Sequence, residues 1–113
     1  MTSINELIAQ QRAFDERHAG SLPFYSPIDE HNLPDLEHLL VCLVGEIGEF
    51  ANIVKKVRRG DFPLSSVKGE LNEELSDVFI YILKIAGQFN VDLEHEYHKK
   101  MNKNEVKFKR YEL

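Results

Sequence analysis

A stripe of apolar residues at helical spacing constrains the fold of this chain more than any other feature of the sequence. Between residues 36 and 57, apolar side chains recur at intervals of three or four positions, and they are Leu36, Leu39, Leu40, Leu43, Ile47, Phe50, Val54 and Val57. Intervals of this kind place side chains on one face of an α-helix. No segment shows the apolar–polar alternation of a strand, so the sequence predicts an all-α protein.

The ends of this helix and of the helix before it are marked by capping residues. Asn32 suits the cap of the long helix, and Pro34 falls in its first turn, where a proline is tolerated. A run of basic residues before Gly60 matches a helix C-terminus. Nearer the start of the chain, Ser3 and Glu6 form a capping box. We therefore expect a first helix that runs to about residue 17.

The third predicted helix runs from residue 65 or 66 to about residue 89, where Asn90 closes it. Its core stripe consists of Leu71, Leu75, Val78, Ile82, Ala86 and Phe89. Ile80 and Leu83 fall on the far side of that helix. Apolar residues on two faces predict a second buried surface, which we expect to be an oligomer contact.

A fourth predicted helix begins after Asp92 and carries Leu93, Tyr97, Met101 and Phe108. Residues 18–32 contain one glycine and two prolines and form a long loop, which is either a lid over a pocket or a packing strap. The chain has no repeat and no interdomain linker. The sequence thus predicts a single domain over residues 1–113, a four-helix-bundle-like fold completed by oligomerisation.

Composition narrows the functional classes. The 113 residues carry a formal net charge of −5, which argues against a dedicated nucleic-acid binder. Cys42 is the single cysteine, so no disulfide forms within the chain. No apolar run is long enough to span a bilayer and the first residues have no signal-peptide core. We expect a soluble, cytoplasmic protein that acts without nucleic acid or membrane.

Two pairs of acids are the strongest candidates for chemistry. Glu46 and Glu49 stand at i and i+3 in the second helix, and Glu74 and Asp77 repeat that spacing in the third. Most acids at helical spacing form a solvated face. Here both pairs flank apolar stripes, whereas Glu73 points away from the core. Four clustered carboxylates need a countercharge, and hard oxygen ligands suit Mg²⁺, with Mn²⁺ as the substitute ion.

Glycines and lysines add to this pattern. Gly45 and Gly48 each precede one of the glutamates, although a glycine inside a helix costs about 1 kcal/mol relative to alanine. Close approach of another helix or of a ligand would explain them. In the fourth helix, Lys100, Asn104 and Lys107 share one face and suit polyphosphate oxygens or a sugar. On spacing alone, however, a basic solvated tail is the better interpretation of that face.

The acid pairs resemble the E-x-x-E…E-x-x-D signature of the MazG-like all-α nucleoside triphosphate pyrophosphohydrolases. The block at residues 74–93, followed by Lys100, Met101 and Asn104, is similar to the dCTP pyrophosphatase-like branch of that family. The segment from Gln11 to His18 resembles the first helix of that branch more loosely. The resemblance covers roughly residues 36 to 108.

The resemblance implies magnesium-dependent cleavage of a nucleoside triphosphate between its α- and β-phosphates, which yields a monophosphate and pyrophosphate. Pyrimidine dNTPs or non-canonical nucleotides are the implied substrates, in a homodimer or homotetramer. The implied metal-binding and catalytic residues are Glu46, Glu49, Glu74 and Asp77. The implied substrate-binding residues are Lys100, Asn104, Lys107, Tyr81, His18 and Phe14. Phe14 stands where that branch has a tryptophan, and this chain has no tryptophan.

Two other functions are compatible with the sequence. A non-catalytic helical interaction or oligomerisation module explains the apolar faces but not the paired acids and glycines. Nucleic-acid binding through the basic segment 99–110 is weaker, because the rest of the chain is acidic.

Overall fold

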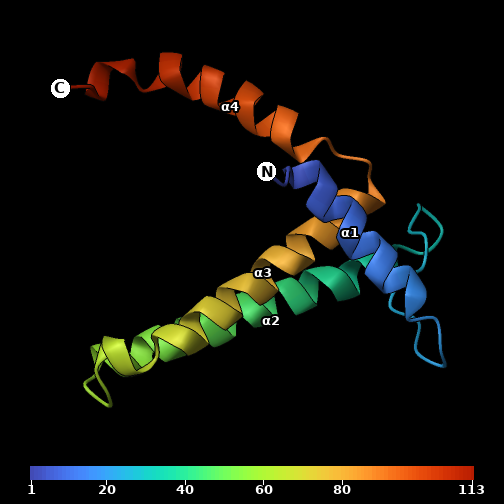
Figure 1. Cartoon of the computed structure of the whole chain (residues 1–113). Helices are drawn as coiled ribbons and strands as arrows, with labels where there is room; N and C mark the ends of the chain where they lie inside the picture. The colour runs from blue at the N-terminus through green and yellow to red at the C-terminus, as the bar shows by residue number, and fades with distance from the viewer. The chain divides into compact units, whose positions relative to one another are not determined.

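The computed structural model describes residues 1–113 and confirms an all-α chain (Figure 1). The α-helices are α1 (Ile4–Arg17), α2 (Leu33–Arg58), α3 (Lys68–Gln88) and α4 (Leu93–Lys107), and two short 3₁₀ helices are η1 (Leu64–Ser66) and η2 (Lys109–Tyr111). The helices form two compact units, one of residues 1–25 with 86–113 and the other of residues 26–85. The expected single domain over residues 1–113 stays a prediction. None of these helices is both long and apolar enough to cross a membrane.

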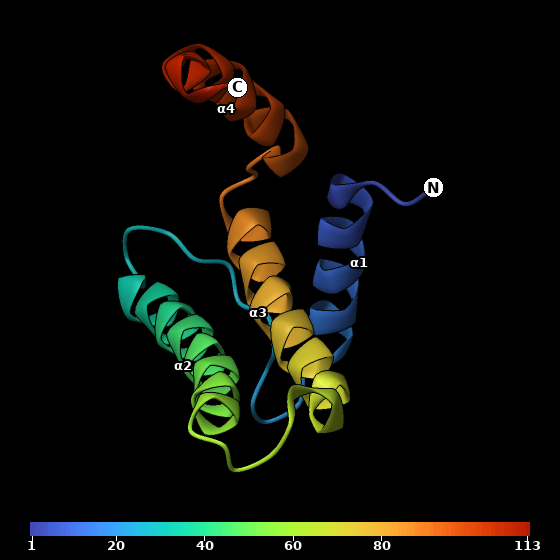
Figure 2. The same cartoon turned by 90° about the vertical axis from the view of Figure 1, so that its left-hand side faces the viewer.

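The unit of residues 26–85 is a helical hairpin in which α2 and α3 lie side by side (Figures 1 and 2). Gly60 ends α2 with a φ of 91°, a left-handed conformation that glycine adopts without a steric cost. The backbone N–H of Asp61 donates to the carbonyl of Lys56 across this turn, at 3.0 Å. Val67 and Leu71 are buried where the chain enters α3. α3 begins at Lys68, two or three residues later than the sequence predicts.

The predicted core stripe of α3 is wrong in part. Leu75 is 56% exposed and Phe89 48%, whereas Leu83, which was expected to face outwards, is buried. Ile80 is half-buried, so these two residues do not form the predicted outer surface. The reason is a rotation of α3 about its axis, since the flank that bears Glu74 and Tyr81 faces α2 instead.

This rotation leaves other apolar residues of the hairpin exposed. We call them the apolar face, and they are Leu40, Ile47 and Val54 of α2 with Leu75, Phe79 and Ile82 of α3. In helical projection, these positions lie to one side of the line where α2 meets α3, and Glu49 and Asp77 lie to the other. The stripes predicted to form the core are therefore exposed in part, at Leu40, Ile47 and Val54 in α2 and at Leu75 and Ile82 in α3, and the second surface predicted at Ile80 and Leu83 is wrong.

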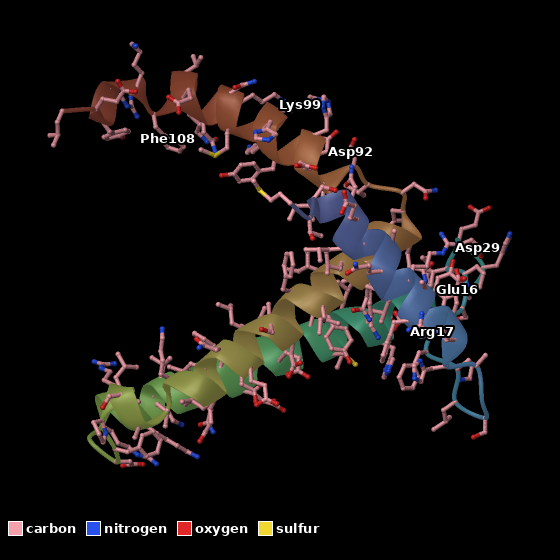
Figure 3. All side chains as sticks on the ribbon, viewed as in Figure 1. Glu16, Arg17, Asp29, Asp92, Lys99 and Phe108 are labelled. Atoms are coloured by element: carbon pink, nitrogen blue, oxygen red, sulfur yellow. The ribbon has the colours of Figure 1, made fainter.

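In the other unit, α1 packs against the last turn of α3 and the start of α4. Ser3 caps α1 by accepting a hydrogen bond from the N–H of Glu6 at 3.1 Å, as predicted. Asp92 caps α4 by accepting from the N–H of His95 at 3.1 Å, and the side chain of Asn5 donates to the same carboxylate. Asn90 closes α3 with a φ of 52°. Figure 3 shows Asp92 at the start of α4.

The long loop is held at each of its ends. In the first unit, the backbone N–H of Phe24 donates to the carbonyl of His18 at 2.9 Å. In the second, the side chain of Asn32 donates to the carbonyl of Pro27 at 2.8 Å and accepts from the N–H of Asp29 at 2.6 Å. Asn32 thus organises the loop instead of capping α2 with its side chain. These contacts lie within the loop itself, and both the packing strap and the lid stay predictions.

Candidate metal centre

Three of the four predicted acids converge in the hairpin. Glu46 of α2 and Glu74 and Asp77 of α3 each offer a carboxylate oxygen, and these oxygens lie within 4.8 Å of one another. The spacing of three residues places Glu74 and Asp77 on one side of α3. The rotation of α3 turns that side towards α2. The convergence therefore depends on the same rotation that exposes Leu75 and Ile82.

Burial makes this cluster unusual among acidic clusters. Glu46, Glu74 and Asp77 are half-buried, as predicted for acids that flank apolar stripes. The Oε2 atoms of Glu46 and Glu74 are shielded from solvent and accept no hydrogen bond. A buried acceptor without a partner loses its hydration and gains nothing in return, which costs about 1–3 kcal/mol. These two oxygens therefore favour a bound positive ligand.

The electrostatics of the cluster lead to the same conclusion. Hydrogen bonding to Glu49, followed by burial and by the negative charge of Glu49, raises the pKa of Glu74 to about 7. Burial is also the main reason why the pKa of Glu46 is raised, with the charges of Glu49 and Asp77 adding to it. Glu49 is exposed but lies within hydrogen-bonding reach of Glu74. All four predicted acids therefore influence one another.

No cation of the chain neutralises these acids. The ion pairs in the structure join Arg12 with Glu16, His31 with Glu30 and Arg59 with Asp61. The donor set consists of carboxylate oxygens alone, which fits a hard divalent cation such as Mg²⁺ or Mn²⁺. Glu46, Glu74 and Asp77 are the residues that can hold such an ion, with Glu49 beside them.

Tyr81 lies at the edge of this cluster and contacts Cys42 of α2. Burial, and then the contact with the Cys42 thiol, raises the pKa of Tyr81. The Sγ of Cys42 lies 3.6 Å from Nε2 of His38, one helical turn earlier on α2. The spacing of four residues between His38 and Cys42 is the feature of the sequence from which their contact could have been predicted.

Gly45 and Gly48 face open space. A Cβ atom added at either position would meet nothing within 4 Å. The close approach of another helix or of a ligand, which the two glycines suggested, stays a prediction.

Phe14 and His18 lie together in the unit that contains α1. Their ring centroids are 4.3 Å apart, and Nδ1 of His18 lies 2.7 Å from the carbonyl oxygen of Phe14. The ring of Phe24 stacks on His18 with a centroid distance of 5.0 Å. Phe14 is 43% and Phe24 52% exposed. The sequence analysis missed Phe24 as a member of this group, although it was one of few aromatic residues in the loop.

The predicted residues of α4 share one surface. Lys100 and Lys107 are exposed and Asn104 is half-buried. The side-chain amide of Asn104 lies 3.9 Å from Sδ of Met101. A groove of about 260 Å³ runs beside them and is lined by Met101, Asn104, Glu105, Phe108 and Glu112.

The profile of the MazG nucleotide pyrophosphohydrolase domain matches residues 35–110, which include the acid cluster and α4. This match confirms the resemblance seen in the acid pairs. It also covers most of the hairpin and most of the second segment of the other unit.

Curated relatives agree with this match. dCTP pyrophosphatase 1 of Rattus norvegicus is 36% identical over 75 residues, which cover 63% of this chain and 44% of that protein. dCTP pyrophosphatase 1 of Homo sapiens is 35% identical over 75 residues, which again cover 63% of this chain and 44% of that protein. Gene 37 protein of Mycobacterium phage L5 is 34% identical over 77 residues, 66% of this chain and 68% of that protein. The match thus spans less than half the length of the mammalian relatives, and no solved structure matches the chain.

Proposed function

Because the chain belongs to the MazG nucleotide pyrophosphohydrolase family, we propose that it is a magnesium-dependent nucleoside triphosphate pyrophosphohydrolase. It cleaves a nucleoside or deoxynucleoside triphosphate between the α- and β-phosphates and releases a monophosphate and pyrophosphate. The observation that carries this proposal is the convergence of Glu46, Glu74 and Asp77 around two buried carboxylate oxygens that accept no hydrogen bond. Pyrimidine deoxynucleotides or non-canonical nucleotides are the proposed substrates, in line with the dCTP pyrophosphatase 1 relatives.

In this proposal the acids hold the metal ion. Mg²⁺ held by these acids would supply positive charge to the phosphates and would activate water as a nucleophile. Glu46, Glu74 and Asp77 provide the oxygen ligands, and Glu49 lies beside them. The pKa of Glu74 is about 7 in the metal-free chain, so this carboxyl has to lose its proton before it can ligate a metal ion. One of the four carboxylates orients or deprotonates the attacking water.

The remaining predicted residues bind the substrate. Lys100 and Lys107 contact the phosphate oxygens, since exposed ammonium groups form charge-assisted hydrogen bonds with phosphates. Asn104 binds the sugar or a phosphate. Tyr81 and the aromatic group of Phe14 and His18 lie near the base or the sugar.

The proposed assembly is a homodimer or homotetramer. Soluble monomers rarely expose a contiguous apolar patch of several side chains without a binding function. The apolar face of the hairpin presents six such side chains. The two most exposed of them are Leu75, at 56%, and Ile47, at 48%. A second copy is the simplest molecule with a matching surface, because a two-fold axis brings identical patches together.

The test is incubation of the purified chain with common and modified NTPs and dNTPs, with Mg²⁺ and with EDTA. We expect a monophosphate and pyrophosphate, and we expect EDTA to abolish the reaction. A diphosphate and orthophosphate would show that a different bond is broken. Absence of hydrolysis across the whole panel would overturn the proposal and favour a non-catalytic interaction module.

A further inference from the structure

His38 and Cys42 form a pair of metal-ligating side chains on α2 that the proposed magnesium site does not use. Nε2 of His38 lies 3.6 Å from Sγ of Cys42. The two residues stand four positions apart, so their side chains leave the same side of the helix. His38 is exposed and Cys42 is half-buried, which leaves the pair open to an ion from solvent.

The separation of the two atoms fits a single tetrahedral ion. Zn²⁺ binds thiolate sulfur at about 2.3 Å and imidazole nitrogen at about 2.0–2.1 Å, so two such ligands at a tetrahedral angle lie about 3.5–3.6 Å apart. The observed 3.6 Å therefore requires almost no movement of either side chain. Two histidines at the same spacing of four residues bind zinc in helical H-E-x-x-H motifs.

The surroundings of the pair supply negative charge and a further donor. The hydroxyl group of Tyr81 contacts the Cys42 thiol from α3, and both Glu46 and Asp77 act electrostatically on Tyr81. Glu46 stands one further turn along α2, and its shielded Oε2 atom accepts no hydrogen bond. A cation beside Cys42 therefore lies in the negative potential of the acid cluster.

The donor atoms distinguish this pair from the acid cluster. Carboxylate oxygens favour Mg²⁺ or Mn²⁺, whereas a thiolate and an imidazole favour Zn²⁺ and other thiophilic ions. Cys42 is a free thiol, so no disulfide competes with such an ion. The two groups of donors can thus select different metals although they are neighbours on α2.

We propose that His38 and Cys42 bind a thiophilic divalent cation such as Zn²⁺, at a second metal site next to the carboxylate site. The ion replaces the proton of the Cys42 thiol, which is released to solvent, and accepts the lone pair of Nε2 of His38. Water fills the coordination positions that the protein leaves open. This site goes beyond the proposed function, because its occupancy requires neither a nucleotide nor hydrolysis.

Cadmium titration of the metal-free chain tests the site, because a thiolate bound to Cd²⁺ gives a ligand-to-metal charge-transfer absorption in the ultraviolet. We expect this absorption to grow until one Cd²⁺ is bound per chain and to persist in excess Mg²⁺, which is a poor ligand for sulfur. Zn²⁺ should displace Cd²⁺ and remove the absorption. Cys42→Ser should lose it, while circular dichroism shows an unchanged helix content.

His38→Ala distinguishes the pair from a thiol that acts alone. Loss of the imidazole should raise the Kd for Cd²⁺ at least about tenfold, since even the outer-shell partners of metal ligands contribute about 10–100-fold to affinity. The matched control is His98→Ala, an exposed histidine of α4, a helix that contains no cysteine. This control should keep the wild-type Kd.

Glu74→Gln tests whether the two sites are separate. This variant removes an acid of the carboxylate site and should keep the absorption, because the thiolate and the imidazole remain. An absorption that is lost in Glu74→Gln, or absent in the wild type, would overturn the inference, and so would an equal Kd in His38→Ala and the wild type. None of these measurements depends on hydrolysis, so a failure of the proposed function leaves them decisive.

Discussion

At the scale of single residues, the four acids have unequal environments although the sequence presents them as two equivalent pairs. Glu74 and Glu46 are half-buried, each with one unpartnered oxygen, whereas Glu49 is exposed. Such differences allow one carboxyl to carry a proton while its neighbours remain charged.

Replacement of a single acid should stop turnover without unfolding the chain. We expect Glu49→Gln or Asp77→Asn to lower activity by more than about 100-fold, because each removes negative charge from the reacting centre. Circular dichroism should show an unchanged helix content. The matched control is Glu73→Gln, an exposed acid beside Glu74 that points away from the cluster and should keep full activity. Full activity in either acid variant would contradict the site assignment.

The raised pKa of Glu74 predicts a pH dependence of stability. Its pKa is about 7 in the folded chain against an ordinary value of 4.5, so the folded state binds this proton more tightly than the unfolded state. The stabilisation is complete below about pH 4.5 and is lost as the pH rises through about 7. The melting temperature of the metal-free protein should therefore fall over this range.

Magnesium should reverse that loss. Metal binding requires deprotonated carboxylates, so Mg²⁺ should raise the melting temperature more at about pH 8 than at about pH 5. Glu74→Gln is the control and should weaken both the pH dependence and the response to Mg²⁺. A stability profile that is flat over this range in the metal-free wild type would be inconsistent with the clustered carboxylates.

At the scale of the elements, the hairpin depends on how α2 ends. Gly60 adopts a left-handed conformation, and the turn after it leads into η1 and the buried Val67. A residue with a Cβ is strained in that conformation by roughly 1–2 kcal/mol.

We therefore expect Gly60→Ala to lower the free energy of unfolding by roughly 1–2 kcal/mol in urea denaturation. The matched control is Gly69→Ala, near the start of α3, where φ is not positive and an added Cβ meets nothing within 4 Å. That variant should gain up to about 1 kcal/mol, because alanine favours the helix over glycine. Equal effects at the two positions would show that the turn does not require the glycine.

At the scale of the whole molecule, the apolar face of the hairpin is the feature that a single chain leaves unexplained. Its six side chains lie on the two helices of the hairpin, and each of them is between 37% and 56% exposed. The proposed homo-oligomer would bury this surface without any further molecule.

Charge placed on the apolar face should weaken that oligomer. We expect Phe79→Glu to shift the sedimentation of the protein towards the monomer, because a carboxylate would have to be buried unpaired. Leu22→Glu is the control, since Leu22 is 83% exposed in the loop outside this face and should not change sedimentation. A monomeric wild type would contradict the proposed assembly.

The sequence alone determined the order of the helices, the caps of α1 and α4 and the pairing of the acids. Periodicity and capping depend on residues within a few positions of one another, which is why α1, the Asp92 cap and the turn at Asn90 were predicted correctly. The family also followed from local spacing, because its acid pairs are one helical turn apart.

Only the tertiary structure decided which face of α3 meets α2. Apolar residues cover more than one side of that helix, so the sequence allowed several rotations, and the expected one buried Leu75 instead of Leu83. The observed rotation brings Glu74 and Asp77 next to Glu46 and leaves two of their oxygens without partners. Rotation of a helix is fixed by the sum of contacts with distant segments, and no local pattern in the chain contains that sum.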